Sequence, residues 1–269
     1  MKVRISRIAL ICIGLIFMGL VLPSQSFAFD YEKHLVGLWK FDEGSGNKTK
    51  DSSGNKLKGE LSESGCKWVD GKFGKAIEFD GATGFVAIKE HANPTKAITV
   101  SAWVKSETPA WNNHGFIMSK RSAYIIHNNE KGVTVSFPIC NGGCWNKSGG
   151  WRDDEVGPKK ITEWHMYTGT FDSKTGEWKI LINGKIESEL KLNEEPISSE
   201  DGMPLWIGSD NCCGGARYGD ITVDEAMVFD KALSEDELKP IFENGIDAAM
   251  SVDSIEKLAA TWGNVKTQY

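Results

Sequence analysis

Residues 219–245, GDITVDEAMVFDKALSEDELKPIFENG, are the stretch from which the fold of the chain can be worked out. Apolar side chains recur there at every second position, as in a strand packed against a core, at Ile221, Val223, Met227 and Phe229. Glu225 falls on the same predicted face and Asp224 on the opposite one. Because a lone carboxylate in an apolar layer costs several kcal/mol, we expect Glu225 to be hydrogen-bonded, paired with a cation or bound to a metal.

A short helix is predicted directly after this strand. Ser234 and Glu237 match the Ser-x-x-Glu capping box of a helix start, and Gly245 is suited to end the helix. We expect the strand itself to pair with the first strand of the mature chain, residues 35–41, which contains Trp39.

The first 28 residues have the three parts of a secretory signal peptide. Basic residues at positions 2, 4 and 7 precede an apolar run over residues 8–22 and a small-residue cleavage site that ends at Ala28. The alternative is a membrane anchor, but the run is shorter than the ~20 residues that a spanning helix needs. We therefore expect a secreted, extracellular protein without a membrane span after cleavage.

Composition limits the class of partner. Without the signal peptide, 28 basic residues face 37 acidic ones, a formal charge of −9. This charge argues against nucleic-acid binding, which needs a basic surface, and is compatible with a bound divalent cation. The remaining 241 residues are predicted to form one large all-β domain, because short strands repeat without a linker.

Five cysteines remain after signal cleavage, and in an oxidising compartment we expect them to pair where geometry allows. Cys140 and Cys144 bracket a turn and are the predicted bridge. Cys212 and Cys213 are adjacent, so they either form a strained vicinal ring or each bonds elsewhere, with Cys66 and the Cys140 loop as partners. The odd count leaves one thiol over.

The loop after the first predicted strand is rich in Gly, Ser, Asn and Asp. Its oxygen donors within a short span are Asp42, Glu43, Asp51 and Asn55. Oxygen donors at this density suit calcium, which takes six to eight such ligands. The alternative is that Asp51 and Asn55 close turns through side-chain hydrogen bonds.

Further short strands are predicted along the chain, with no helical segment before residue 234. Asn183-Gly184 between two of them is a strong two-residue hairpin signal. About a dozen strands bounded by Gly, Asn or Asp predict an all-β fold, a two-sheet antiparallel jelly-roll sandwich with one short C-terminal helix. The main predicted strands cover residues 77–79, 85–88, 98–105, 115–119, 123–127, 133–137, 164–171, 177–183, 185–190 and 205–208.

Five motifs in this order carry a family resemblance: LVGLWKFDEGSG…DSSGN, KFGKAIEFDG…GFVAI, ITVSAWVK, WHMYTGTFD…WKILINGK and ITVDEAMVFDKALSEDEL. Together they resemble the laminin-G-like jelly roll of the concanavalin A-like lectin/glucanase superfamily. The resemblance covers residues 35–245 and leaves residues 246–269 as a C-terminal tail. It implies a curved two-sheet jelly roll with adjacent first and last strands and a structural Ca²⁺ near that edge, held by Asp42, Asp51 and Asp224.

Catalysis is not expected. Glucan-hydrolysing members of the superfamily use carboxylates that alternate along one inner strand, because retaining hydrolysis needs two carboxyls ~5 Å apart. The sequence has no such run, no Gly-x-Ser-x-Gly elbow and no metal-ligand spacing among its five histidines. The acidic clusters at residues 153–155 and 235–237 are predicted to be solvated charge.

Loop aromatic residues suggest a binding site instead. Trp111, Trp145 and Trp151 lie in predicted loops near polar residues, where a sugar ring could stack on them. The alternative is that these tryptophans cover the open end of the sandwich. Arg217 and Tyr218 are predicted to lie beside the same loops.

The sequence therefore predicts a secreted, monomeric, non-catalytic recognition module that binds a glycan or an extracellular protein, with a structural calcium ion. Two alternative functions remain open: an adhesion or scaffold module whose tail docks a partner through Trp262, and a polysaccharide hydrolase. Glycosylation at the sequons of Asn47 and Asn146 also remains open.

Overall fold

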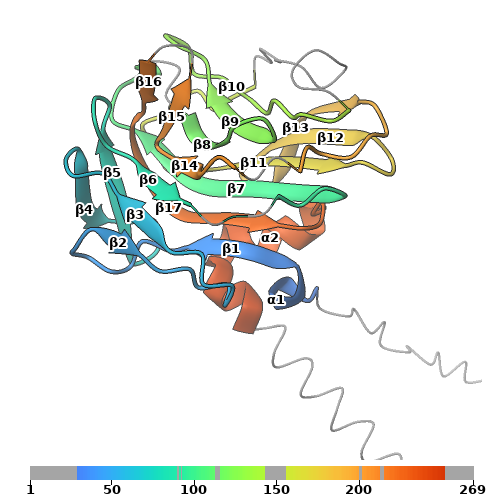
Figure 1. Ribbon diagram of the computed structural model, residues 1–269, viewed down its shortest axis with the longest axis horizontal. Helices are drawn as coiled ribbons and strands as arrows, with labels where there is room; N and C mark the ends of the chain where they lie inside the picture. Colours follow the sequence, from blue (N-terminus) through green and yellow to red (C-terminus); the bar gives the residue numbers. More distant parts are fainter. Residues whose placement is uncertain are drawn as a thin grey trace, which may run out of the picture.

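A computed structural model of the chain describes residues 29–89, 91, 93–112, 116–142, 156–199, 202–212 and 215–251. Two antiparallel sheets and a separate hairpin form a β sandwich, as predicted (Figure 1). Within the described residues, no helix is both long and apolar enough to cross a membrane.

The eight-stranded sheet is organised around its longest strands, β7 and β17. The order across the sheet is β13-β12-β11-β7-β17-β5-β4, and β1 also pairs with β17. Its strands are β1 (Leu35–Trp39), β4 (Cys66–Asp70), β5 (Lys75–Asp80), β7 (Ala97–Ser106), β11 (His165–Asp172), β12 (Glu177–Ile182), β13 (Lys185–Lys191) and β17 (Asp220–Phe229). Asn183 and Gly184 both have positive φ in the turn between β12 and β13, which confirms the predicted hairpin.

The seven-stranded sheet faces it, in the order β10-β9-β8-β14-β6-β3-β2. Its strands are β2 (Lys48–Thr49), β3 (Gly59–Leu61), β6 (Val86–Ile88), β8 (Phe116–Lys120), β9 (Tyr124–Asn128), β10 (Val135–Ser136) and β14 (Leu205–Ile207). The separate hairpin, β15 (Ser209–Cys212) and β16 (Gly215–Tyr218), follows β14 directly and contacts β8.

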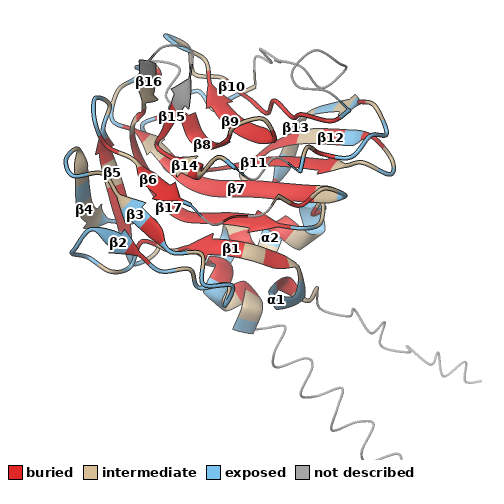
Figure 2. Cartoon of the chain, viewed as in Figure 1, coloured by how far each residue is buried: buried red, intermediate tan, exposed pale blue. Residues whose placement is uncertain are grey.

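The main core lies between the two sheets, where the inward side chains of both are fully buried (Figure 2). Trp39 from β1 belongs to this core, and it pairs with Ala226 of β17. The predicted pairing of the first and last strands is therefore confirmed. Burying such aromatic and β-branched side chains is the dominant stabilising contribution to a sandwich of this kind.

A second apolar cluster covers the outer face of the eight-stranded sheet. Helix α2 (Glu235–Asn244) packs there through Phe242, whose ring stacks on Trp103 of β7 at a centroid distance of 5.5 Å. Ser234 and Glu237 form the predicted capping box, and Gly245 ends the helix with a φ of 81°. Helix α1 (Tyr31–His34) contributes Tyr31 to the same cluster.

A β-bulge in β17 corrects the predicted faces of this strand. The register of β17 against β7 shifts between Asp224 and Met227, and Glu225 has a φ of 43°. The shift reverses the alternation, so Met227 and Phe229 face the helices, whereas Val223 faces the core between the sheets. The prediction of one common face was wrong because an inserted residue breaks a period of two.

Helical structure resumes over residues 246–251. Ile246 and Ala249 are buried in the outer cluster with α2. The first turn of the predicted tail therefore packs against the sheet, so the packed unit extends past the predicted boundary at residue 245.

Candidate functional site

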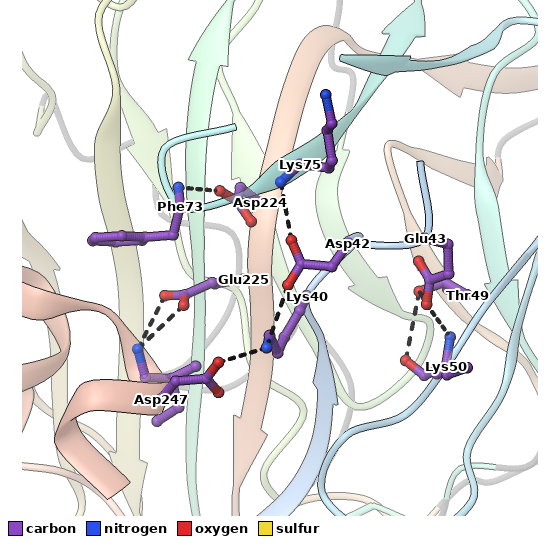
Figure 3. A network of polar contacts seen from close by, with 11 residues as sticks. Lys40, Asp42, Glu43, Thr49, Lys50, Phe73, Lys75, Asp224, Glu225 and Asp247 are labelled. Carbon is purple, nitrogen blue, oxygen red and sulfur yellow. Dashed lines mark hydrogen bonds and ion pairs between the residues drawn. The ribbon is translucent and has the colours of Figure 1, made fainter. Parts of the chain in front are cut away.

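Two buried carboxylates, those of Asp224 and Glu225, lie together on one edge of β17. β5 pairs with residues 220–223 of this edge and β1 with residues 226–229, so Asp224 and Glu225 lie between the two ladders. β7 occupies the opposite edge. The bulge thus places two adjacent acidic residues at a gap in the sheet (Figure 3).

Asp224 is buried and only partly satisfied. Its Oδ2 atom accepts the backbone N–H of Phe73 at 2.8 Å, and its Oδ1 atom is buried with no hydrogen-bond partner among the described residues. Burial raises the pKa of Asp224 to about 7, and the nearby Asp42 carboxylate acts in the same direction, against the backbone donors. This carboxyl is therefore partly protonated at neutral pH.

Glu225 lies beside it and faces the C-terminal helical turn. Both of its oxygens accept the backbone N–H of Ile246, at 3.2 and 3.3 Å. Burial raises the pKa of Glu225 to about 8, and the charges of Asp224 and Asp247 contribute. The expectation that Glu225 must be hydrogen-bonded is confirmed, and its partner lies in the predicted tail.

Lys40 supplies the positive charge at this gap. Its Nζ atom lies 2.6 Å from Asp247 and 3.3 Å from Asp42 (Figure 3). The backbone N–H of Lys75 donates to Asp42 Oδ1 at 2.9 Å. Lys40, Asp42 and Asp247 line an open cleft of about 240 Å³ that Phe73 and Gly245 also border.

Asp51 does not join this cluster. Its Oδ1 atom accepts the backbone N–H groups of Leu38 and Ser53, and its Oδ2 atom accepts that of Leu57. The turn-closing alternative therefore describes Asp51, and its assignment as a calcium ligand is corrected. Asn55 likewise donates its amide to the carbonyls of residues 35 and 36.

The remaining residues fit a cation only in part. Asp42 and Asp224 lie close enough to interact electrostatically, and the unpartnered Oδ1 of Asp224 is the type of oxygen that a hard cation takes. Among the described residues, no group of three or more His, Cys, Asp or Glu side chains is arranged to hold a metal. Further ligands would have to be backbone carbonyls or water.

Trp111 lies in the core and is not an exposed platform. Only 1% of it is accessible, and its ring meets that of Tyr167 edge-on at 5.9 Å. The backbone of Trp111 is held by hydrogen bonds to Gly132 and from Lys131, which turn the loop inward. The prediction that Trp111 offers a surface for stacking is therefore corrected.

Several predicted residues cannot be placed. Trp145, Trp151, Cys144 and Cys213 lie outside the described residues, and the side chain of Cys212 is also outside them. Cys140 is buried. The pairing of these cysteines stays a prediction, and Cys66 is a free thiol.

Arg217 and Tyr218 lie on β16 next to the Trp111 loop, and their expected place beside the loop of Trp145 and Trp151 stays a prediction. Asn112 ties the two segments together, because its amide donates to the carbonyl of Tyr218 and accepts from the backbone N–H of Asp220. Arg217 and Tyr218 are both partly exposed. The hairpin and the Trp111 loop thus lie at one end of the sandwich.

A further aromatic pair lies on the outer face of the seven-stranded sheet. Leu205 and Ile207 of β14 point into the core, so Trp206 between them points outward. Trp206 is partly exposed, and its ring centroid lies 4.5 Å from that of Phe85 at a tilt of 59°. The sequence analysis missed Trp206, although the apolar residue on each side of it is a signal for an outward aromatic side chain.

A buried ion pair lies beside this aromatic pair. Arg121 Nη1 contacts Asp210 Oδ2 at 2.8 Å, and Asp210 is only 1% accessible. Burial raises the pKa of Asp210, against the opposing effects of Arg121 and of the Ser119 hydroxyl. Ser119 is also the residue directly opposite Trp206 in the ladder of β14 and β8, so the ion pair and the aromatic pair are neighbours.

The sequence matches the profile of Laminin_G_3, which describes the concanavalin A-like lectin/glucanases superfamily, over residues 80–239. This match spans more than half of the chain. The chain belongs to the concanavalin A-like lectin/glucanase superfamily. The predicted resemblance and the predicted fold class are thereby confirmed.

Solved structures that share the fold of this chain include binding domains. One is domain 4 of AbnA, a GH43 extracellular arabinanase from Geobacillus stearothermophilus, solved in complex with arabinotriose. Its sequence is 19% identical to this one and its TM-score is 0.60. The match covers 78% of this chain and 98% of that chain. The binding domain of Botulinum neurotoxin DC, solved in complex with rat synaptotagmin II, is 14% identical at a TM-score of 0.58, over 78% and 51%.

The binding domain of Paraclostridial Mosquitocidal Protein 1 is 16% identical at a TM-score of 0.55, over 78% of this chain and 52% of that one. The superfamily fold thus corresponds to about half of each toxin binding domain and to nearly all of the arabinanase domain. A search among curated proteins found no match to the sequence.

Proposed function

We propose that this chain is an exported, non-catalytic module that binds carbohydrate on the outer face of the seven-stranded sheet, around Trp206. The observation that carries the proposal is the partly exposed pair of Trp206 and Phe85, next to the polar pair of Arg121 and Asp210. The binding surface that we assign is therefore an aromatic platform with charged groups at its side.

The chemistry of sugars fits such a surface. A pyranose ring presents an apolar C–H face, which stacks on an indole that loses little rotamer freedom on binding. Its hydroxyl groups need directional polar partners, and side chains already held in place give specificity without ordering costs. Asp210 and Arg121 hold each other in this way.

The comparisons support this class of ligand. The arabinanase domain was solved with arabinotriose, and the binding domain of Botulinum Neurotoxin DC was solved in complex with SialylT. The second of these domains was also solved with a protein, synaptotagmin II. A protein partner is therefore the alternative outcome of the binding experiment below.

The buried carboxylates support a structural role for the acidic gap. Asp224 holds the backbone of the loop between β4 and β5 through Phe73, and Glu225 holds Ile246. Both carboxylates therefore bind backbone groups of this chain. For the same position we propose a structural calcium ion with Asp42 and Asp224 as side-chain ligands; the orphaned Oδ1 atom of Asp224 supports this assignment.

A glycan array followed by isothermal titration of the best ligand tests the proposal. We expect Trp206→Ala to weaken binding at least about tenfold, since a stacked ring contributes of the order of 1.4 kcal/mol or more. Trp164→Ala is the matched control, because Trp164 is also partly exposed but lies at the start of the other sheet. Melting curves of both variants confirm folding.

Two results would contradict this assignment. Equal losses of affinity in the two tryptophan variants would mean that Trp206 has no special role. Binding that is unchanged in Trp206→Ala but lost in Trp145→Ala or Trp151→Ala would move the site to the loop of those two residues.

A further inference from the structure

The hairpin that follows β14 places Arg217 directly opposite Asp210. Residues directly opposite each other in an antiparallel pair point to the same side of the ladder. The side chain of Asp210 points to Arg121 and Ser119 at β8, so Arg217 points to the same side of the hairpin. The attraction between Arg217 and the Asp210 carboxylate also acts to lower the pKa of Asp210.

Asp210, Arg121 and Arg217 together carry a net positive charge. Asp210 contributes one negative charge and is paired with Arg121 at 2.8 Å. Arg217 makes no hydrogen bond or ion pair with any side chain in the described part of the chain. Arg217 is a partly exposed residue, so one positive charge with five N–H donors remains available to a ligand.

The arginines are concentrated here. Arg121 and Arg217 are the two arginines of the described residues, and both lie beside Asp210, although the chain as a whole has a formal charge of −6. Arginine differs from lysine because its planar fork binds a carboxylate through two parallel hydrogen bonds. Arg217 therefore offers a planar fork of the kind that suits a carboxylate.

We propose that the Trp206 surface recognises an acidic saccharide, with Arg217 binding the carboxylate of a uronic or sialic acid residue while the chain of sugar rings runs across Trp206. This inference rests on the proposed function and names its class of ligand. Asp210 acts as a positioning residue in it, since its carboxylate contacts Arg121 at 2.8 Å and lies directly opposite Arg217 in the hairpin.

Matched pairs of saccharides that differ in the carboxylate test the proposal. Trigalacturonate is compared with its methyl ester, and sialyllactose with lactose, by titration against the wild-type protein. We expect at least one acidic sugar to bind about tenfold or more tightly than its neutral counterpart, and the difference to shrink as salt is added.

Three variants locate the charge that is responsible. Arg217→Ala should remove the preference for the acidic sugar and leave the affinity for the neutral one within about twofold, whereas Arg217→Lys should retain part of the preference. Lys239→Ala is the control, because it removes the same charge from exposed α2 on the outer face of the other sheet.

The outcomes separate this inference from the proposed function. If acidic and neutral sugars bind equally, and Trp206→Ala weakens both, the acidic preference is wrong and the carbohydrate site stands. If Lys239→Ala reduces the preference as much as Arg217→Ala does, the effect is general charge attraction and the assignment of Arg217 is wrong. If no saccharide binds, both proposals fail.

Discussion

Glu225 in β17 accepts the backbone N–H of Ile246 with both carboxylate oxygens, at 3.2 and 3.3 Å, across 21 positions of the chain. This contact fastens the end of α2 to the gap between β1 and β5. It also buries a carboxyl group whose neighbours, Asp224 and Asp247, carry the same charge. The stability of this part of the molecule should therefore depend on protonation.

We expect the protein to become less stable as the pH rises through neutrality. In the unfolded chain Glu225 loses its proton near its ordinary pKa of 4.5, whereas in the folded protein it keeps the proton up to about pH 8. Between these values the folded state binds more protons, so stability is greatest below pH 4.5 for this group and falls as the pH rises. The loss is on the order of 5 kcal/mol for Glu225.

Urea unfolding at several pH values, with chelator present, measures this dependence. Glu225→Gln is the matched variant, because the amide keeps the shape and one acceptor but does not ionise. It should reduce the slope between about pH 5 and pH 8 and leave the part that belongs to Asp224, whose pKa is also raised. A wild-type protein that gains stability over this range would show that the carboxyl is ionised when folded.

Chelation tests the calcium proposal. We expect EDTA to lower the melting temperature of the wild-type protein, because an ion that binds only the folded state stabilises it. Asp224→Asn should abolish the response, whereas Asp51→Ala should retain it, since the Asp51 carboxylate accepts backbone N–H groups of Leu38, Ser53 and Leu57. A melting temperature that is indifferent to EDTA would rule out a structural ion.

Removing Asp51 should destabilise the fold through its turn. Asp51→Ala leaves the N–H groups of Leu38, Ser53 and Leu57 without their acceptor, and we expect a loss of about 2–3 kcal/mol in the free energy of unfolding. Asp70→Ala is the control, since this carboxylate is 89% exposed and makes one surface ion pair with Lys75. Its loss should be much smaller, because an exposed ion pair contributes little to stability. Similar losses in both variants would contradict the assigned role of Asp51.

Gly169 should not tolerate alanine. A Cβ atom at this position in β11 would lie 2.3 Å from the ring of Phe137, which belongs to the core between the sheets. Overpacking of this kind costs about 1–3 kcal/mol. Gly132→Ala is the control, because its nearest neighbour is 3.4 Å away. Thermal unfolding compares the two, and an unchanged melting temperature in Gly169→Ala would show that the Phe137 ring moves freely.

Sequence patterns were sufficient for the architecture but not for the site. Repeated apolar alternation, turn residues and the capping box of Ser234 and Glu237 are local signals, and the structure bears them out. The outward faces of Met227 and Phe229 depend on a bulge of one residue, which leaves no mark in the pattern. Trp206, by contrast, could have been found from the alternation of β14 alone.

The site residues depended on contacts between distant parts of the chain. Asp51 has the oxygen atoms of a calcium ligand and of a turn, and only its hydrogen bonds to backbone N–H groups in the fold separate the two roles. Trp111 is in a polar segment, yet its ring is buried against Tyr167, which is 56 positions away in the sequence. The cluster of Asp210 with its two arginines forms only when the hairpin folds back on β8.

The position of β17 also has a consequence for the order of events during synthesis. This strand leaves the ribosome after β1, β5 and β7, yet it joins β7 on one edge to both β1 and β5 on the other. A nascent chain that ends before residue 220 has no partner for those edges, so the eight-stranded sheet cannot close until residues 220–229 have been made. Such late, long-range pairing is slow and exposes apolar strands, and we expect truncated chains to be prone to aggregation.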